Sequence, residues 1–317
     1  MRYDVFNGDA DGLCSLHQLR LAEPADSTLV TGVKRDIALL QRVPASHGDT
    51  ITVLDVSLDK NRDALRAALD AGASVRYIDH HQPGEILVHD RLEAHIDVAA
   101  ETCTGLIVDG LLGGAHRGWA VTAAFGDNLL SQARAAAVPL ALSSVDLNTL
   151  QALGTLLNYN GYGATLEDLL FDPAELYRQL KPHADPLDFV RQTDTFSALQ
   201  AGYADDRARV DALQAERISE GGALYRLPDA AWARRIGGVW ANELAQAAPA
   251  RAHALLTERT DGAYVVSVRA PLERRDGADA LCGAFQTGGG RKAAAGINRL
   301  PADEVGRFAQ AFQERYG

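Results

Sequence analysis

The regular alternation of β-prone and helix-prone segments in the first 80 residues is the feature that most restricts the fold. The expected strands are residues 3–6, 27–32, 51–57 and 73–79, and the expected helices are residues 13–19, 37–43 and 61–71. Strands and helices in this order form a parallel sheet with right-handed crossover connections. The sequence therefore predicts an α/β fold that begins at the N-terminus.

Acidic and imidazole side chains follow three of these expected strands. Asp9 and Asp11 follow the first strand, Asp55 lies at the end of the third, and Asp79-His80-His81 closes the fourth. Ligands of open α/β sheets bind just beyond the carboxyl ends of the strands. Taken alone, each motif has an ordinary explanation, such as helix capping by Asp11 or a solvated histidine pair. Their repetition at strand ends predicts one shared site.

A further acid has a similar sequence context. The apolar run at residues 119–125 leads into Gly126-Asp127-Asn128, and a helical segment follows, in the same order as around Asp55. We therefore expect Asp127 to follow an apolar element near the same edge of the sheet. The preceding residues 101–112 are expected to be helical.

Carboxylates mixed with imidazoles form a ligand set that suits Mn²⁺, with Mg²⁺ or Co²⁺ as alternatives. Several aspartates can hold two such ions close together, an arrangement that polarises phosphoryl oxygens and activates water. The three cysteines, Cys14, Cys103 and Cys282, are too widely spaced for a thiolate zinc site or a disulfide framework. The candidate ligands and their neighbours are Asp9, Asp11, Asp55, Asp79, His80, His81 and Asp127.

The remainder of the chain has a different pattern. Residues 130–222 favour helix, interrupted at residues 158–163 by a turn-like segment whose tyrosines suit local packing slightly better than base stacking. The charged residues 204–220 are expected to form a helical connector between domains. Beyond it, residues 235–245 favour helix, and residues 252–257 and 264–269 favour strand. We expect a catalytic domain at 1–195, a connector at 196–224 and a substrate-binding domain at 225–317.

A glycine triplet in the C-terminal part is a candidate anion site. Gly288, Gly289 and Gly290 precede Arg291 and Lys292, and we interpret the small residues that follow as the start of a helix. Backbone N–H groups of such a loop, aided by a helix dipole, can bind phosphate. A flexible turn explains the glycines alone equally well, but the two adjacent cations favour phosphate binding.

Composition restricts the partners. The chain has 317 residues, 47% of them hydrophobic, and a net charge of −11. Such an acidic protein does not attract long duplex nucleic acid, so we expect a short or small anionic substrate. No apolar run is long enough to span a membrane, and the first residues lack the hydrophobic core of a signal peptide. We therefore expect a cytoplasmic protein without a membrane partner, and a homodimer is left open.

The ordered motifs resemble those of the DHH phosphoesterases, the superfamily of RecJ and the nano-RNases. Four motifs carry the resemblance: Asn7-Gly8-Asp9-Ala10-Asp11-Gly12, Leu54-Asp55, Asp79-His80-His81 and Gly126-Asp127-Asn128. The segment 288–296, preceded by 266–269, resembles the DHH-associated substrate-binding domain. The resemblance covers nearly the whole chain and implies a metal-dependent phosphoesterase.

The resemblance also implies roles for particular residues. Asp9 would bind one Mn²⁺, Asp11, His80 and Asp127 would bind a second, and Asp55 would bridge the two ions. His81 would contact the scissile phosphate or assist the leaving group, with Asp79 orienting its neighbours. The expected substrate-binding residues of the accessory domain are Arg269, Gly288, Gly289, Gly290, Arg291 and Lys292.

Three positions depart from the family pattern. Val5 stands where many members have histidine, Asn7 stands where RecJ-type members often have an acid, and Arg291 follows the glycine triplet in place of histidine. The first ion would therefore be held less by protein than in those members. Three hypotheses follow: a phosphodiesterase acting on a short oligonucleotide or small nucleotide, a polyphosphatase or pyrophosphatase, and a non-catalytic nucleotide or metal sensor.

Overall fold

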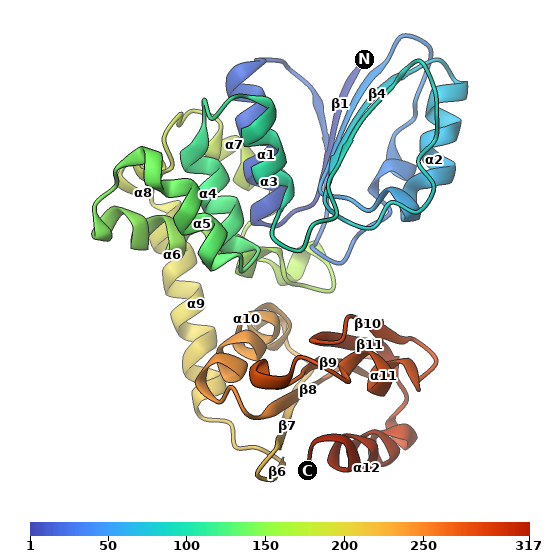
Figure 1. The fold of residues 1–317 in the computed structure, drawn as a ribbon, viewed down its shortest axis with the longest axis vertical. Helices are drawn as coiled ribbons and strands as arrows, with labels where there is room; N and C mark the ends of the chain where they lie inside the picture. The colour runs from blue at the N-terminus through green and yellow to red at the C-terminus, as the bar shows by residue number, and fades with distance from the viewer. The chain divides into compact units, whose positions relative to one another are not determined.

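The computed structural model describes all residues, 1–317, and the chain divides into two compact units, Met1–Ala201 and Gly202–Gly317 (Figure 1). Each unit has its own β-sheet. No helix has both the length and the apolar character needed to cross a membrane.

The sheet of the first unit has five strands in the order β2-β1-β3-β4-β5, and every neighbouring pair is parallel. The strands are β1 (Arg2–Phe6), β2 (Thr28–Val30), β3 (Thr50–Leu54), β4 (Ser74–Asp79) and β5 (Leu92–Ile96). The predicted α/β class and parallel pairing are confirmed. The sequence did not predict β5, because this edge strand is largely accessible to solvent and lacks the apolar pattern of a buried strand.

Helices pack on both faces of this sheet. α2 (Leu58–Asp70) lies on one face, while α1 (Ala10–Ala22) and α3 (Thr104–Leu111) lie on the other (Figure 1). On the α2 side, Leu65 and Leu69 belong to the same buried cluster as Val53 of the central strand β3. Residues 37–43, expected to be helical, contain only the short 3-10 helix η1 (Leu39–Arg42).

The apolar run at residues 119–125 is a helix, whereas the apolar run before Asp55 is strand β3. The first of these runs belongs to α4 (Arg117–Gly126), which is completely buried from Trp119 to Ala124. A helix buried on all sides has no polar face, and periodicity alone does not distinguish it from a buried strand. The other helices of this unit are α5 (Leu130–Ala137), α6 (Ser144–Gly161), α7 (Pro173–Leu180), α8 (Pro186–Gln192) and the first part of α9 (Thr195–Asp211).

The turn expected at residues 158–163 begins later than the composition suggests, because α6 continues to Gly161. Asn160 is completely buried, and its amide group donates to the carbonyl of Phe171 (2.9 Å) and accepts from the N–H of Phe171 (3.0 Å). A turn-forming residue is tolerated in the helix because its polar atoms have partners there. Tyr159 is completely buried.

The second unit has a six-stranded sheet in the order β10-β11-β9-β8-β7-β6, in which only β7 and β8 are parallel. Its strands are β6 (Arg217–Ile218), β7 (Gly222–Leu227), β8 (Ala252–Glu258), β9 (Tyr264–Arg269), β10 (Gly288–Gly290) and β11 (Ala294–Leu300). Its helices are α10 (Ala231–Ala247), α11 (Ala278–Gly283) and α12 (Val305–Tyr316). Phe308 and Phe312 of α12 pack with Val266 and Val268 of β9 in one core.

Two expectations about the second half are wrong. The glycine triplet does not precede a helix: Gly288–Gly290 is strand β10, and the small residues after it form the antiparallel strand β11. A helix dipole is therefore absent there. The charged connector is helical only as far as Asp211, where α9 ends, and the chain then enters β6 at Arg217. Small and charged residues favour helix only weakly, so the same segment can form a strand where a neighbouring strand is available for pairing.

Candidate metal centre

Asp9 ends the turn between β1 and α1 and forms the N-cap of that helix. Its Oδ1 accepts hydrogen bonds from the backbone N–H groups of Asp11 (3.0 Å) and Gly12 (3.1 Å). The sequence had suggested Asp11 as the cap, which is wrong. Because Asp9 satisfies the N–H groups of α1, the side chain of Asp11 is left for other partners.

Asp11 binds the N-terminus of α3. Its two carboxylate oxygens accept from the backbone N–H groups of Thr104 (2.8 Å) and Gly105 (2.7 Å). A Cβ atom on Gly105 would lie 2.5 Å from the Cβ of Ala123, so glycine is needed for this approach. The sequence motifs gave no sign of Thr104 or Gly105, because these residues carry no metal-binding side chain.

Asp55 follows β3 in a left-handed backbone conformation, with φ of 56°. Such a conformation is uncommon for residues other than glycine, and strained residues cluster at functional sites. Its backbone N–H donates to the carbonyl of Ile78 (3.1 Å), and its Oδ1 accepts from the hydroxyl of Thr104 (3.3 Å). Burial, reinforced by the charges of Asp11 and Asp9, raises the pKa of Asp55 well above its usual value.

His80 points one ring nitrogen into the acid cluster. Its Nδ1 is 3.1 Å from the carbonyl of Thr102 and therefore donates to it, which leaves Nε2 directed at the carboxylates. Nε2 lies 3.4 Å from Oδ1 of Asp55 and 3.9 Å from oxygens of both Asp11 and Asp127. Burial lowers the pKa of His80, but the hydrogen bond to Asp55 and the surrounding acids outweigh it and raise the pKa to about 10.

His81 and Asp79 form a second polar pair. The Nδ1 atom of His81 is 2.7 Å from Oδ1 of Asp79, and the His81 ring lies 4.5 Å from the His80 ring, centroid to centroid. Asp79 is completely buried, and its Oδ2 has no hydrogen-bond partner among the protein atoms. Asp79 therefore fixes the orientation of the more exposed His81 ring.

Asp127 reaches the cluster from the C-cap of α4. Burial raises its pKa to about 6, against the opposing charge of Lys34. The position of Asp127 therefore depends on helix packing and not on a strand end. α4 packs beside α1 and α3, and this packing brings its C-terminal end to the cluster.

The side chains form two overlapping groups that could hold divalent cations. Within each group the candidate ligand atoms lie within 4.8 Å of one another. The groups are Asp55, His80 and His81, and Asp11, His80 and Asp127. Oxygen donors with one or two imidazoles suit a hard or borderline ion such as Mn²⁺. The pKa values of Asp55 and Asp127 are raised because both acids are buried near other acids. A bound cation would reduce the repulsion between these carboxylates, so the pKa values also fit a cation site.

Lys34 is a member of the cluster that sequence reasoning missed. It lies between β2 and η1, and its ammonium group pairs with Oδ2 of Asp9, donates to the side chain of Asn158 (2.8 Å) and lies 3.9 Å from Asp127. Burial raises the pKa of Asp9, but the Lys34 charge outweighs it, with the net effect of lowering that pKa. No motif marks the segment around Lys34, so only the folded path of the chain reveals it.

The expected substrate-binding residues all lie in the second unit. Arg269 ends β9 opposite Ala294 of β11, where it donates to the side chains of Asn242 (2.8 Å) and Ser267 (3.0 Å). Arg291 lies in the turn between β10 and β11 and exchanges backbone hydrogen bonds with Ala294. The register therefore brings Arg269 and Arg291 to the same end of the sheet. Arg291 and Lys292 are exposed, and Lys292 lies 3.6 Å from Asp276.

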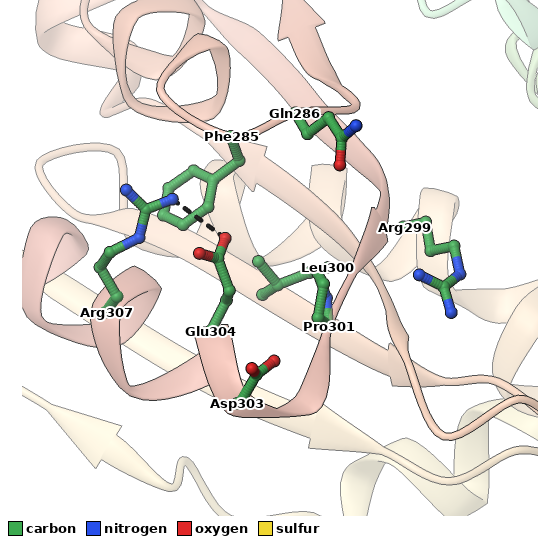
Figure 2. A pocket seen from close by; sticks show the side chains of 8 residues that line it. All are labelled: Phe285, Gln286, Arg299, Leu300, Pro301, Asp303, Glu304 and Arg307. Atoms are coloured by element: carbon green, nitrogen blue, oxygen red, sulfur yellow. Dashed lines mark hydrogen bonds and ion pairs between the residues drawn. The ribbon is translucent and has the colours of Figure 1, made fainter.

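The second unit also has a cavity of about 330 Å³, shown in Figure 2. Arg307 lies over the Phe285 ring, 4.3 Å from its centroid, and pairs with Glu304 at 3.0 Å. Arg299, on another wall, pairs with Asp261 at 3.0 Å. Asp303 and Glu304 also line the cavity, so acids share its walls with the arginines and we assign no anionic ligand to it. It is lined by Phe285, Gln286, Arg299, Leu300, Pro301, Asp303, Glu304 and Arg307.

Comparison with solved structures identifies the fold, although no family model and no curated protein matches the sequence. A manganese-bound RecJ exonuclease aligns with 99% of this chain and 89% of its own, with a TM-score of 0.61 and 18% identity. The pGpG-specific phosphodiesterase PggH from Vibrio cholerae aligns over 99% and 98%, with a TM-score of 0.56 and 17% identity. The chain has the RecJ fold. The RecJ of Thermus thermophilus, also with Mn²⁺, gives a TM-score of 0.62 and 20% identity, but only 52% of its length is covered.

The RecJ fold confirms the architecture that the four DHH-like motifs implied. It includes both units, since the alignments cover nearly all of this chain.

Proposed function

We propose that the protein is a metal-dependent phosphodiesterase that hydrolyses a short oligonucleotide or small nucleotide. The convergence of Asp11, Asp55, His80 and Asp127 carries this proposal, because these residues come from four separate segments and meet within a few ångströms. The RecJ fold supports it, since the compared enzymes include an exonuclease and a phosphodiesterase.

The cluster would hold up to two divalent cations, with Mn²⁺ the best match to its ligands. Asp11, His80 and Asp127 would hold one ion, Asp9 the other, and Asp55 would serve both. Bound ions of this kind supply Lewis acidity to a phosphoryl oxygen and lower the pKa of water. The amides of α3 hold Asp11, and the carbonyl of Thr102 holds His80, so both ligands are oriented before an ion binds.

His81 is the proposed proton donor to the leaving group. Because its Nδ1 donates to Asp79, its Nε2 is left free to carry and transfer a proton. The His81 side chain is 38% exposed, which leaves it accessible to a substrate, whereas Asp79 is inaccessible. Asp79 would act through His81 by fixing the ring and stabilising its protonated form.

The second unit would bind the end of the substrate. Arg269 at the end of β9 and Arg291 in the turn after the glycine strand β10 lie at the same end of its sheet, and β11 lies between the two strands. Guanidinium groups bind phosphate through two parallel hydrogen bonds, and a strand without side chains lets a ligand approach the backbone closely. We assign Arg269, Arg291, Lys292 and Gly288–Gly290 to recognition of a terminal phosphate or nucleotide.

A substrate of about dinucleotide size is favoured. The chain spans 98% of PggH, whose substrate is named as pGpG. A net charge of −11 also disfavours the long, continuous phosphate contacts that a polymer substrate would make.

A substrate panel tests the proposal. Purified protein with Mn²⁺ would be incubated with 5′-phosphorylated linear dinucleotides, single strands of increasing length, cyclic dinucleotides, polyphosphate and pyrophosphate. We expect mononucleotide release, fastest from the shortest linear substrates, and its loss in an Asp55→Asn variant. Orthophosphate release from polyphosphate or pyrophosphate alone would replace the proposal with a polyphosphatase. Nucleotide binding without turnover on any substrate would indicate a sensor.

A further inference from the structure

The ammonium group of Lys34 lies inside the acid cluster. It pairs with Oδ2 of Asp9, lies 2.8 Å from the Asn158 side-chain oxygen and 3.9 Å from Oδ1 of Asp127. Only 24% of the Lys34 side chain is exposed. A positive charge on the protein itself therefore occupies part of a region whose other charged groups are mostly acids.

The surroundings of Lys34 hold it in this position. Its backbone N–H donates to the carbonyl of Gly161 (2.8 Å), and its carbonyl accepts from the side chain of Asn7 (3.2 Å). Its ammonium also lies 5.5 Å from the centre of the Tyr162 ring, where a cation is attracted to the π face. The two hydrogen bonds hold the backbone of Lys34, so the backbone would stay near Asp9 even if the ammonium group moved away from it.

The end of α6 approaches Asp9 closely because residue 161 is glycine. A Cβ atom there would lie 3.0 Å from the Cβ of Asp9, tighter than ordinary contact. The glycine thus brings Asn158, one turn earlier in the same helix, within reach of Lys34. Asn158 accepts a hydrogen bond from the ammonium and so supplies it with a neutral partner in addition to the acid.

Both carboxylate oxygens of Asp9 have partners within the protein. Oδ1 accepts from two backbone N–H groups and Oδ2 from Lys34. Asp9 also belongs to neither group of residues whose ligand atoms converge. An ammonium and a divalent cation compete for the same carboxylate oxygen and repel each other at short distance. The two halves of the site therefore differ in how readily they accept an ion.

We propose that Lys34 is a built-in counterion for the Asp9 half of the site, so that the protein without substrate binds one divalent ion tightly. That ion would be held by Asp11, Asp55, His80 and Asp127. A second ion would bind at Asp9 only when the ammonium leaves Oδ2, as when a substrate phosphate offers it another anionic partner. The inference rests on the proposed metal centre and makes Lys34 a positioning residue of that centre.

Metal titration without substrate tests this inference. Mn²⁺ binding would be followed by calorimetry and by electron paramagnetic resonance, which detects coupling between two neighbouring Mn²⁺ ions. Wild type, Lys34→Met, Lys34→Arg and the control Lys181→Met would be compared. Lys181, the C-cap residue of α7, is 52% exposed and pairs with Asp26 at 3.5 Å, so its loss removes the same charge away from the acid cluster.

We expect wild type, Lys34→Arg and Lys181→Met to bind one ion tightly and to give the spectrum of isolated Mn²⁺. Lys34→Met should bind two ions, with the second at least about tenfold tighter than in wild type, and should show the coupled spectrum. Methionine fills the space of the lysine stem without its charge. Two tight ions in wild type, equal affinities in wild type and Lys34→Met, or no Mn²⁺ binding by either protein would overturn the inference.

Thermal unfolding gives a second measurement that does not require activity. In EDTA, Lys34→Met should unfold at a lower temperature than wild type, because Asp9 loses its counterion, and saturating Mn²⁺ should remove the difference. A deficit of equal size with and without Mn²⁺ would mean that Lys34 has only a structural role, and would overturn the inference. If Lys34→Met does not fold, the stoichiometry of wild type still decides. Absence of turnover on every phosphodiester would reject the proposed function while leaving the stoichiometry readable.

Discussion

The acid cluster of the first unit and the glycine hairpin of the second are both candidate sites for a phosphorylated substrate, but they are built in opposite ways. The acid cluster joins Asp11, Asp55, His80 and Asp127, which are far apart in the sequence and largely buried. The hairpin joins neighbours in sequence, Gly288–Gly290 and Arg291, and its cation is exposed. The first site is a product of tertiary structure, whereas the second is local.

This difference determines how each site responds to mutation. Buried acids that repel one another are held together by the rest of the fold, so removing one can relieve strain while abolishing ion binding. Exposed cations are screened by water and contribute little to stability, so their loss should affect substrate binding alone. Stability and activity should therefore separate clearly in the two regions.

The largest expected effect is at Asp55. Asparagine also tolerates the left-handed conformation, so Asp55→Asn should fold. We expect turnover to fall by about 1,000-fold or more, because a shared ligand is lost. The melting temperature in EDTA should stay the same or rise, because burial and neighbouring acids raise the pKa of Asp55. A fall in that temperature would show that Asp55 stabilises the fold, contrary to the comparison.

The next effect concerns acid stability and compares the two units through their buried histidines. Burial lowers the pKa values of His17 in the first unit and His253 in the second to about 4, from an ordinary 6.5. Between these pH values the unfolded chain binds protons that the folded chain does not. The contribution of these two neutral histidines to stability should therefore be fully present above pH 6.5 and be lost as the pH falls towards about 4. For His17 this loss is about 3 kcal/mol.

Hydrogen exchange measured peptide by peptide at pH 7 and pH 5 checks this expectation. His17→Gln keeps a donor for the carbonyl of His183, which His17 contacts at 2.7 Å, and should remove part of the acid sensitivity of the first unit only. His253→Gln is the matched variant for the second unit. If neither substitution changes the acid sensitivity of its unit, groups other than these two histidines cause it.

A smaller effect is expected at Arg269. Arg269→Met should raise KM for a dinucleotide about tenfold and leave kcat within about twofold, because a contact present equally in ground and transition states contributes only to binding. Arg259, which pairs with Asp261 just beyond the other end of the β8–β9 strand pair, is the control, and Arg259→Met should change neither constant. A fall in kcat in Arg269→Met at unchanged KM would assign the residue to the chemical step.

The smallest effect is expected at Gly289, whose Cβ position faces open space. Gly289→Ala should change the free energy of unfolding by no more than about 0.5 kcal/mol, while KM rises several-fold because the methyl group obstructs a ligand at the strand. Gly288→Ala is the contrast, because a Cβ atom there would lie 1.8 Å from the Cys282 carbonyl oxygen and should destabilise the unit. Unchanged kinetics in Gly289→Ala would remove β10 from the proposed binding surface.

The same contrast explains what the sequence could predict. The parallel strands were readable because apolar runs alternate with helices, and the edge where Asp55 and Asp79 lie follows from parallel pairing. Lys34 and the amides of Thr104 and Gly105 were not readable, because their roles depend on the path of loops and on backbone atoms that every residue has.

One segment whose structure was left open and one wrong prediction have a common physical cause. Residues 119–125 before Asp127 and residues 293–296 after the glycine triplet are mostly small or apolar, and such residues form helices or strands according to what packs around them. The segment before Asp127 is helical because it is buried among other helices, and the segment after the glycine triplet is a strand because it pairs with β9. Local sequence does not contain either piece of information.

The backbone geometry at Asp55 limits what can replace it. With φ of 56°, the position excludes β-branched and bulky side chains whatever their chemistry. In a library randomised at this codon and selected for folding alone, we expect Asp, Asn and Gly to dominate the survivors. Selection for turnover should leave only Asp. The first screen would therefore show which residues the backbone conformation at position 55 allows, and the second would show which of them the reaction requires.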